Sequence, residues 1–321
     1  MNINYINKDY FDKNNNCSFK LECKKDSFLH SINQFKIPYS TNYSLPKNMQ
    51  FGIEMEFENV SINQLSEELM DFQVKDGLMP TQDWYAKDDI TVSNVFMDDY
   101  IGGEVNSPIM TGKKQEWKDL KFICDLIKKQ GGYISENCSL QAHFDFLKLD
   151  FNNQDIINLI YLWYQYEDII YQFSCGEDEN LRYGIVNNAG SIREFVNTII
   201  NYQKWDDLFN GNLGEFKKVF GLDISRYLEY INRDYHDYPT IEFRTGNGTL
   251  NPIIIQNYIR LYSNLLRTVK MKNKNMHINS KLSKVDYFEL ENNLEKACSF
   301  ADLIFINNFD KACFIKQYKK K

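Results

Sequence analysis

Two segments of the sequence carry glutamates in positions where their carboxylates could hold a metal ion together. FGIEMEFE (51–58) carries Glu54 and Glu56 between apolar residues, and IGGEVNSP (101–108) carries Glu104 between small residues. A period of two is typical of a β-strand that buries one face, so these carboxylates would project from the other face.

Two later segments follow the same pattern and add different polar groups. CSLQAHFDF (138–146) places Gln141, His143 and Asp145 on one side, and TIEFR (240–244) places Glu242 and Arg244 on one side. Any one of the four segments fits a sheet face that simply contacts water. The four segments together fit a solvent-exposed face poorly. Glutamate is depleted in strands, and adjacent like charges are costly unless cations are bound.

Divalent metal ions are the natural compensation for such a face. Residues i and i+2 of a strand lie roughly 6–7 Å apart, so Glu54 and Glu56 could hold separate ions or share two. Oxygen-rich ligands with little histidine and no cysteine favour Mg²⁺ or Mn²⁺ over structural zinc.

Phosphate groups often accompany these ions, and the stretch after Glu242 is suited to bind them. The Arg244 guanidinium can contact two phosphate oxygens at once. The Gly246–Thr249 turn, which contains Asn247 and Gly248, could bring backbone N–H groups close to a nucleotide. A helix that begins at Pro252 would point its positive end toward the same place.

The remaining pattern predicts a mixed α+β domain with short strands and several helices. Residues 1–48 are interpreted as an N-terminal extension that packs on the main domain. Residues 49–271 would form the catalytic domain, and 272–321 a C-terminal helical segment of the same domain with a basic tail. Helices are predicted at 113–130, 154–173, 252–271 and 285–302.

Composition narrows the class of protein. A net charge of -7 argues against sequence-independent binding of nucleic acid. No apolar run is long enough for a membrane span, and no signal peptide is recognisable at the start. Seven scattered cysteines without a CxxC pair favour a reducing, cytoplasmic location. The oligomeric state is left open, a homo-oligomer included.

The four segments, together with GGEVNSPIM and EFRTGNGTL, resemble the amidoligase family in their order along the chain. This family belongs to the carboxylate–amine ligase superfamily of glutamine synthetase and glutamate–cysteine ligase, and the resemblance covers about residues 50–266. It implies a catalytic half-barrel of antiparallel strands with helices on its outside. It also implies ATP and two or three divalent ions, Mg²⁺ or Mn²⁺.

The resemblance also implies roles for individual residues. Glu54, residue 141 and Glu242 would hold the ion nearest the ATP phosphates, whereas Glu56 and Glu104 would hold the ion near the substrate carboxylate. A further acidic ligand corresponds to Asp89, with Asp88 as the second choice. Nucleotide contacts would come from His143, Arg244, Asn247 and Gly248, and Arg182 matches a substrate-binding or phosphate-binding arginine.

One position departs from the family pattern. Relatives carry histidine where this chain has Gln141, while a second histidine is retained as His143. A glutamine oxygen can bind Mg²⁺, but it is a neutral and weaker ligand. Three readings follow: activity with a changed metal preference, one weak ion site, or a decayed active site.

The implied reaction is a two-step acyl activation of a small-molecule or peptide carboxylate, followed by attack of an amine. Asp145 is the predicted acceptor of the amine proton. Two alternatives use the same face: a small-molecule phosphotransferase, and a non-catalytic binding protein with a decayed ligase site. A cysteine hydrolase is disfavoured, because Cys138 falls on the strand face opposite His143.

Overall fold

The structure is a computed structural model, and the described residues are 31–75, 84–96, 98–175, 190–210, 220–232, 238–271, 281–285 and 293–319. Within these ranges the chain forms one mixed α+β arrangement around an antiparallel sheet. The α+β class predicted from the sequence is confirmed. A half-barrel of the glutamine synthetase type stays a prediction.

The sheet has seven strands in the order β2-β4-β1-β5-β7-β6, with β3 paired to β4 on one side. All the strand pairs are antiparallel. The strands are β1 (Phe51–Ser61), β2 (Tyr85–Lys87), β3 (Asn94–Phe96), β4 (Asp99–Asn106), β5 (Ser139–Asp145), β6 (Leu222–Asp223) and β7 (Thr240–Asn247).

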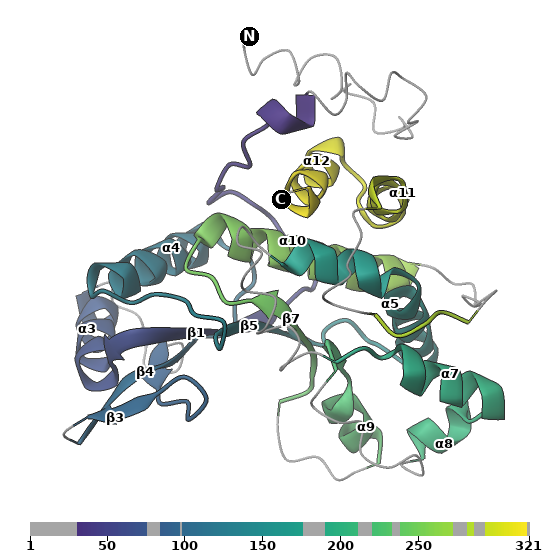
Figure 1. Cartoon of the computed structure of the whole chain (residues 1–321), viewed down its shortest axis with the longest axis horizontal. Helices are drawn as coiled ribbons and strands as arrows, with labels where there is room; N and C mark the ends of the chain where they lie inside the picture. Colours follow the sequence, from purple (N-terminus) through teal and green to yellow (C-terminus); the bar gives the residue numbers. More distant parts are fainter. Residues whose placement is uncertain are drawn as a thin grey trace.

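Helices cover the apolar face of this sheet in two layers. Figure 1 shows α4 (Lys114–Lys129), α10 (Pro252–Met271) and α5 (Asn153–Ser174) over the sheet. A second layer, α11 (Leu294–Ile304) and α12 (Asn308–Tyr318), lies on their far side. The other helices are α3 (Ile62–Lys75), α7 (Arg193–Tyr202), α8 (Trp205–Phe209) and α9 (Ser225–Ile231).

The helices predicted at 113–130, 154–173 and 252–271 are confirmed as α4, α5 and α10, and their ends follow from local chemistry. Asn152 caps α5 by accepting hydrogen bonds from the backbone N–H groups of Gln154 and Asp155. Pro252 begins α10, where its missing N–H costs nothing. Of the helix predicted at 285–302, residues 294–302 are helical, and residues 286–292 lie outside the described residues. The sequence did not predict α3, α7, α8, α9 or α12.

A row of aromatic rings fixes how the strands sit against the helices. Trp117 of α4 stacks on Phe51 at 5.9 Å between ring centroids, and Phe51 stacks on Phe144 at 5.8 Å. Phe144 contacts Phe243 edge-on at 5.7 Å, and Phe243 stacks on Tyr262 of α10 at 4.3 Å. Because these rings take one face of β1, β5 and β7, alternate residues must project from the other face.

The described part of the N-terminal segment packs on the helical layer. Ser40 exchanges two backbone hydrogen bonds with the Gln256 side chain, and Tyr43 O accepts one from Trp117 Nε1. Residues 1–30 of the predicted extension lie outside the described residues, and the predicted domain boundaries stay predictions. Among the described residues, no helix is both long and apolar enough to cross a membrane.

Candidate functional site

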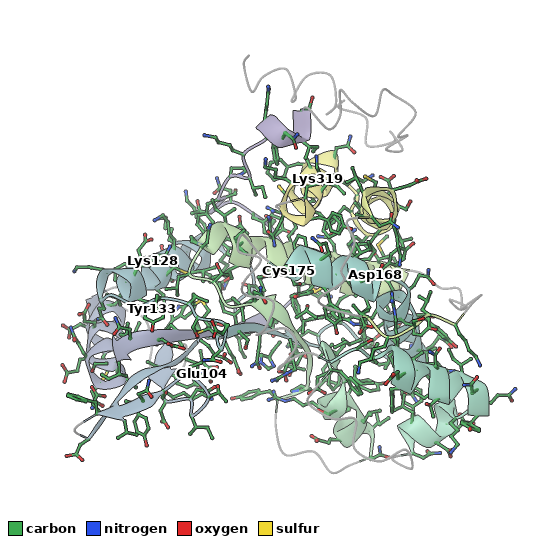
Figure 2. The ribbon with its side chains drawn as sticks, in the orientation of Figure 1. Glu104, Lys128, Tyr133, Asp168, Cys175 and Lys319 are labelled. Atoms are coloured by element: carbon green, nitrogen blue, oxygen red, sulfur yellow. The ribbon has the colours of Figure 1, made fainter. Side chains whose placement is uncertain are left out.

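The strand register brings most of the predicted site residues onto the sheet face that lies away from α4, α5 and α10, which we call the bare face. Glu54 of β1 lies opposite Gln141 of β5, and Glu56 of β1 lies opposite Glu104 of β4. His143 lies opposite Glu242 on β7. Figure 2 shows Glu104 on the side of β1 that faces away from α4 and α10.

Three carboxylates converge at one end of this face and form what we call the acidic cluster: Glu56, Asp89 and Glu104. One oxygen from each lies within 4.8 Å of the others. Glu56 and Glu104 are buried, and Asp89 is half-buried. The cluster joins β1 and β4 with the loop after β2, which the strand pattern alone did not connect. Asp88, the second choice from the sequence, is exposed and lies outside the cluster.

The acidic cluster has the electrostatic signature of carboxylates held together. Burial raises the pKa of Glu56 to about 7, and the charges of Asp89 and Glu104 add to the shift. Hydrogen bonds from Ser139 oppose it: Ser139 N donates to Glu56 Oε2 at 2.6 Å and Ser139 Oγ donates to Oε1 at 2.8 Å. A bound cation would relieve this cost.

Close packing of β2 on β4 positions the loop that carries Asp89. A Cβ on Gly103 would lie 2.3 Å from Lys87 O, so only glycine allows this approach. Lys87 Nζ then lies 2.6 Å from Glu104 Oε1, and Asn106 Nδ2 donates to the same oxygen at 2.8 Å. Sequence reasoning missed Lys87, because its three-residue strand is too short to show a period of two. It also missed Asn106, although Asn106 follows Glu104 by two residues on β4.

The second set of predicted ligands is arranged differently. Arg244 Nη1 donates to Gln141 Oε1 at 3.0 Å and also bonds Glu242 Oε1. His143 lies between two carboxylates, with Nε2 3.1 Å from Glu54 Oε1 and Nδ1 4.0 Å from Glu242 Oε2. Neither Glu54 nor Glu242 belongs to a set of three convergent His, Cys, Asp or Glu ligands within the described part of the chain.

Glu54 is nevertheless in a cationic environment. Burial opposes its ionisation, but the hydrogen bond and charge of His143, with Lys87 and Arg226, outweigh burial and lower its pKa. Glu54 is therefore held as a carboxylate by groups of the protein itself.

A cavity of about 320 Å³ opens beside Glu54 and His143. Arg226 of α9 lies in its wall and donates from Nη1 to Thr240 Oγ1 at 3.1 Å. Asp145 also lines it, but Asp145 Oδ1 accepts from the N–H groups of residues 147 and 148 and so holds the turn after β5. Its predicted role as proton acceptor stays a prediction. The other lining residues are Gln50, Phe51, Gly52, Ile53, Tyr85, Asn106, Ser107, Pro108, Ile109, Tyr238 and Pro239.

The turn after β7 packs into the fold. Asn247 is buried and donates from Nδ2 to Cys175 O at 3.1 Å, and Gly248 N donates to Cys138 O at 3.1 Å. The structure thus gives Asn247 and Gly248 packing contacts, while their contact with a nucleotide stays a prediction. Arg182 lies outside the described residues. Cys138 is buried, and burial raises the pKa of its thiol to about 11, which does not suit a nucleophile.

Fold and site together define an α+β protein whose bare sheet face carries a candidate metal centre beside a pocket. The family model described as "Putative amidoligase enzyme" matches residues 47–266. The chain therefore belongs to the amidoligase family, as its sequence motifs predict, and this membership indicates a ligase-type enzyme. A comparison with curated proteins returned no match.

Proposed function

We propose that the chain is an ATP-dependent carboxylate–amine ligase, which forms an amide or isopeptide bond through an acyl phosphate. The observation that carries this proposal is the acidic cluster of Glu56, Asp89 and Glu104 on the bare sheet face of an amidoligase-family chain.

The acidic cluster fits a hard divalent cation. It offers only carboxylate oxygens, which Mg²⁺ and Mn²⁺ prefer, and these oxygens lie within 4.8 Å of one another. Burial and mutual repulsion raise the pKa of Glu56 to about 7, and a bound cation would offset this cost of ionising the cluster. When bound, the ion would neutralise charge on phosphate and carboxylate oxygens as they approach each other.

The proposed reaction has two steps. A substrate carboxylate oxygen attacks the γ-phosphorus of ATP, the bond to the β–γ bridging oxygen breaks, and ADP leaves. The amine nitrogen then attacks the acyl carbon, the bond to the phosphate oxygen breaks, and the nitrogen loses a proton to a base. Arg244 would donate hydrogen bonds to the transferring phosphoryl group, and Asp145 would accept the proton.

The cavity is the place where the substrates would enter. Arg226 supplies a guanidinium that can hold a carboxylate, while Tyr85 and Tyr238 offer aromatic surface at the rim. Glu54 and His143 lie in the same wall, so a group bound to Arg226 is adjacent to the polar sheet face. These features support a small-molecule or peptide substrate that carries a carboxylate.

The test measures ADP and phosphate release from Mg²⁺-ATP and Mn²⁺-ATP, with and without pooled carboxylates and amines. We expect release that needs metal and amine, with a product in mass spectrometry equal to carboxylate plus amine minus water. Glu104→Gln should lower the rate at least about 100-fold. Glu58→Gln is the matched control, because this β1 glutamate bonds Ser135 and Tyr133 away from the cluster.

Other outcomes identify the alternatives. ADP release without an amine, together with a phosphorylated acceptor, would establish a phosphotransferase. ATP binding without release under any pool, unchanged when histidine is restored at Gln141, would favour a non-catalytic binding protein.

A further inference from the structure

Arg244 lies where the amidoligase resemblance predicts a second metal ion. The predicted ligands on β5 and β7 are Gln141 and Glu242, and a single nitrogen, Arg244 Nη1, hydrogen-bonds an oxygen of each. The Arg244 and Glu242 side chains are 16% and 5% exposed, so this contact is largely shielded from water. We call this arrangement of Gln141, Glu242 and Arg244 the guanidinium bridge.

We propose that the protein holds one divalent ion, in the acidic cluster, and that the Arg244 guanidinium takes the place of the second. The inference rests on the proposed ligase function, because the phosphate groups of ATP would need positive charge both at the acidic cluster and beside Glu242. It replaces the expectation of two or three protein-bound ions.

The sheet register explains why the bridge forms. The β5–β7 ladder pairs Ala142 with Phe243 and shifts register before Leu140 pairs with Gly246, so Gln141 lies at the irregularity, across from the stretch that begins at Arg244. Glu242 is two residues before Arg244 on the same strand and projects from the same face. The three side chains therefore meet beside the irregularity in the β5–β7 ladder.

Glutamine suits this bridge because its two ends have opposite hydrogen-bonding character. Gln141 Oε1 accepts from Arg244, and Gln141 Nε2 points to Glu56 Oε1 of the acidic cluster at 3.5 Å. A metal-ligating histidine would offer a single lone pair to a cation. Gln141 thus satisfies a guanidinium on one side and a cluster carboxylate on the other.

Glu54 and Glu242, the predicted carboxylate ligands outside the acidic cluster, each contact a basic side chain of the protein. Glu242 pairs with Arg244, and Glu54 lies 3.1 Å from His143 Nε2. The acidic cluster differs, since its three carboxylates share one lysine, Lys87, as their ion-pair partner among the described residues. The imbalance that calls for a divalent cation is therefore confined to the cluster.

The test counts Mn²⁺ ions bound by the metal-free, nucleotide-free protein, using the electron paramagnetic resonance signal of free Mn²⁺. We expect one ion per chain for wild type. Glu104→Gln should reduce this to none, whereas Glu242→Gln and the control Glu58→Gln should leave one. The double variant Gln141→His with Arg244→Ala should gain a second ion, provided that its circular dichroism matches wild type.

Crystals of wild type soaked with MnCl₂ and a non-hydrolysable ATP imido analogue test the same point without a variant. We expect an anomalous peak in the acidic cluster and none within coordination distance of Glu242. A peak at Glu242, or two ions in wild type that fall to one in Glu242→Gln, would overturn the guanidinium bridge and leave the ligase proposal standing. Absence of any bound ion would overturn the proposal of one protein-bound ion, while the turnover assays report on the ligase proposal separately.

Discussion

Replacement of Glu56 by glutamine should change the stability of the metal-free protein in opposite directions at low and high pH. Burial raises the pKa of this carboxyl from 4.5 to about 7, with added repulsion from Asp89 and Glu104. Between these two values the folded protein keeps a proton that the unfolded chain has lost. The free energy of unfolding of wild type therefore falls as pH rises through this window.

The size of the effect follows from the shift. One pKa unit corresponds to about 1.4 kcal/mol, so wild type should lose about 3 kcal/mol between pH 4.5 and pH 7. Glutamine does not titrate and avoids this loss. Its amide group cannot accept both Ser139 hydrogen bonds, which should cost about 1–2 kcal/mol at every pH. Glu56→Gln is thus expected to be less stable than wild type at pH 4.5 and more stable by about 1–2 kcal/mol at pH 8.

Urea unfolding in EDTA at the two pH values measures this difference, with Glu58→Gln as the control on the same strand. If the difference between Glu56→Gln and wild type were the same at both pH values, the cause given for the pKa shift would be wrong. Addition of Mn²⁺ at pH 8 should stabilise wild type and not the variant, because only the native acidic cluster binds the ion.

Three further changes test other parts of the site. Gly103→Ala should weaken Mn²⁺ binding at least about tenfold in a titration, because the new Cβ would displace β2 and Asp89. Gly52→Ala is the control, because a Cβ there would have its nearest neighbour at 3.7 Å. Arg226→Ala should raise KM for the carboxylate about 10- to 100-fold in steady-state kinetics, and an equal rise for ATP would contradict the assignment. Glu167→Ala should lower the free energy of unfolding in urea by about 3–5 kcal/mol, because four hydrogen-bond donors lose a buried acceptor; a loss under about 1 kcal/mol would refute this.

The parts of the fold that the sequence predicts are those governed by local rules. Alternation marks β1, β5 and β7 because one face of each is filled by core side chains such as Phe144 and Phe243. The starts of α5 and α10 are readable because Asn152 and Pro252 act within one turn. These features need no knowledge of what lies across the sheet.

The parts that escape prediction depend on long-range packing. Lys87 reaches Glu104 only because Gly103 lets β2 approach β4, and nothing near Lys87 in the sequence signals this. Arg226 lies on the seven-residue helix α9 and lines the cavity. The residues next to it in sequence form no motif that would indicate a binding site. The guanidinium bridge likewise depends on the β5–β7 register. The sequence predicts both strands but not how they pair.

The glutamine at position 141 is better explained by a rearranged centre than by a decayed one. Decay would be expected to leave a buried carboxylate without a charge partner, and such a carboxylate is costly enough to be lost or neutralised. Glu242 instead has Arg244, and the side-chain oxygen of Gln141 accepts a hydrogen bond from the same arginine. The three carboxylates of the acidic cluster are also present, with the repulsion that a metal ion would relieve. A protein that keeps this electrostatic cost in the acidic cluster, while pairing Glu242 with Arg244, has the arrangement expected of a centre that still binds a cation.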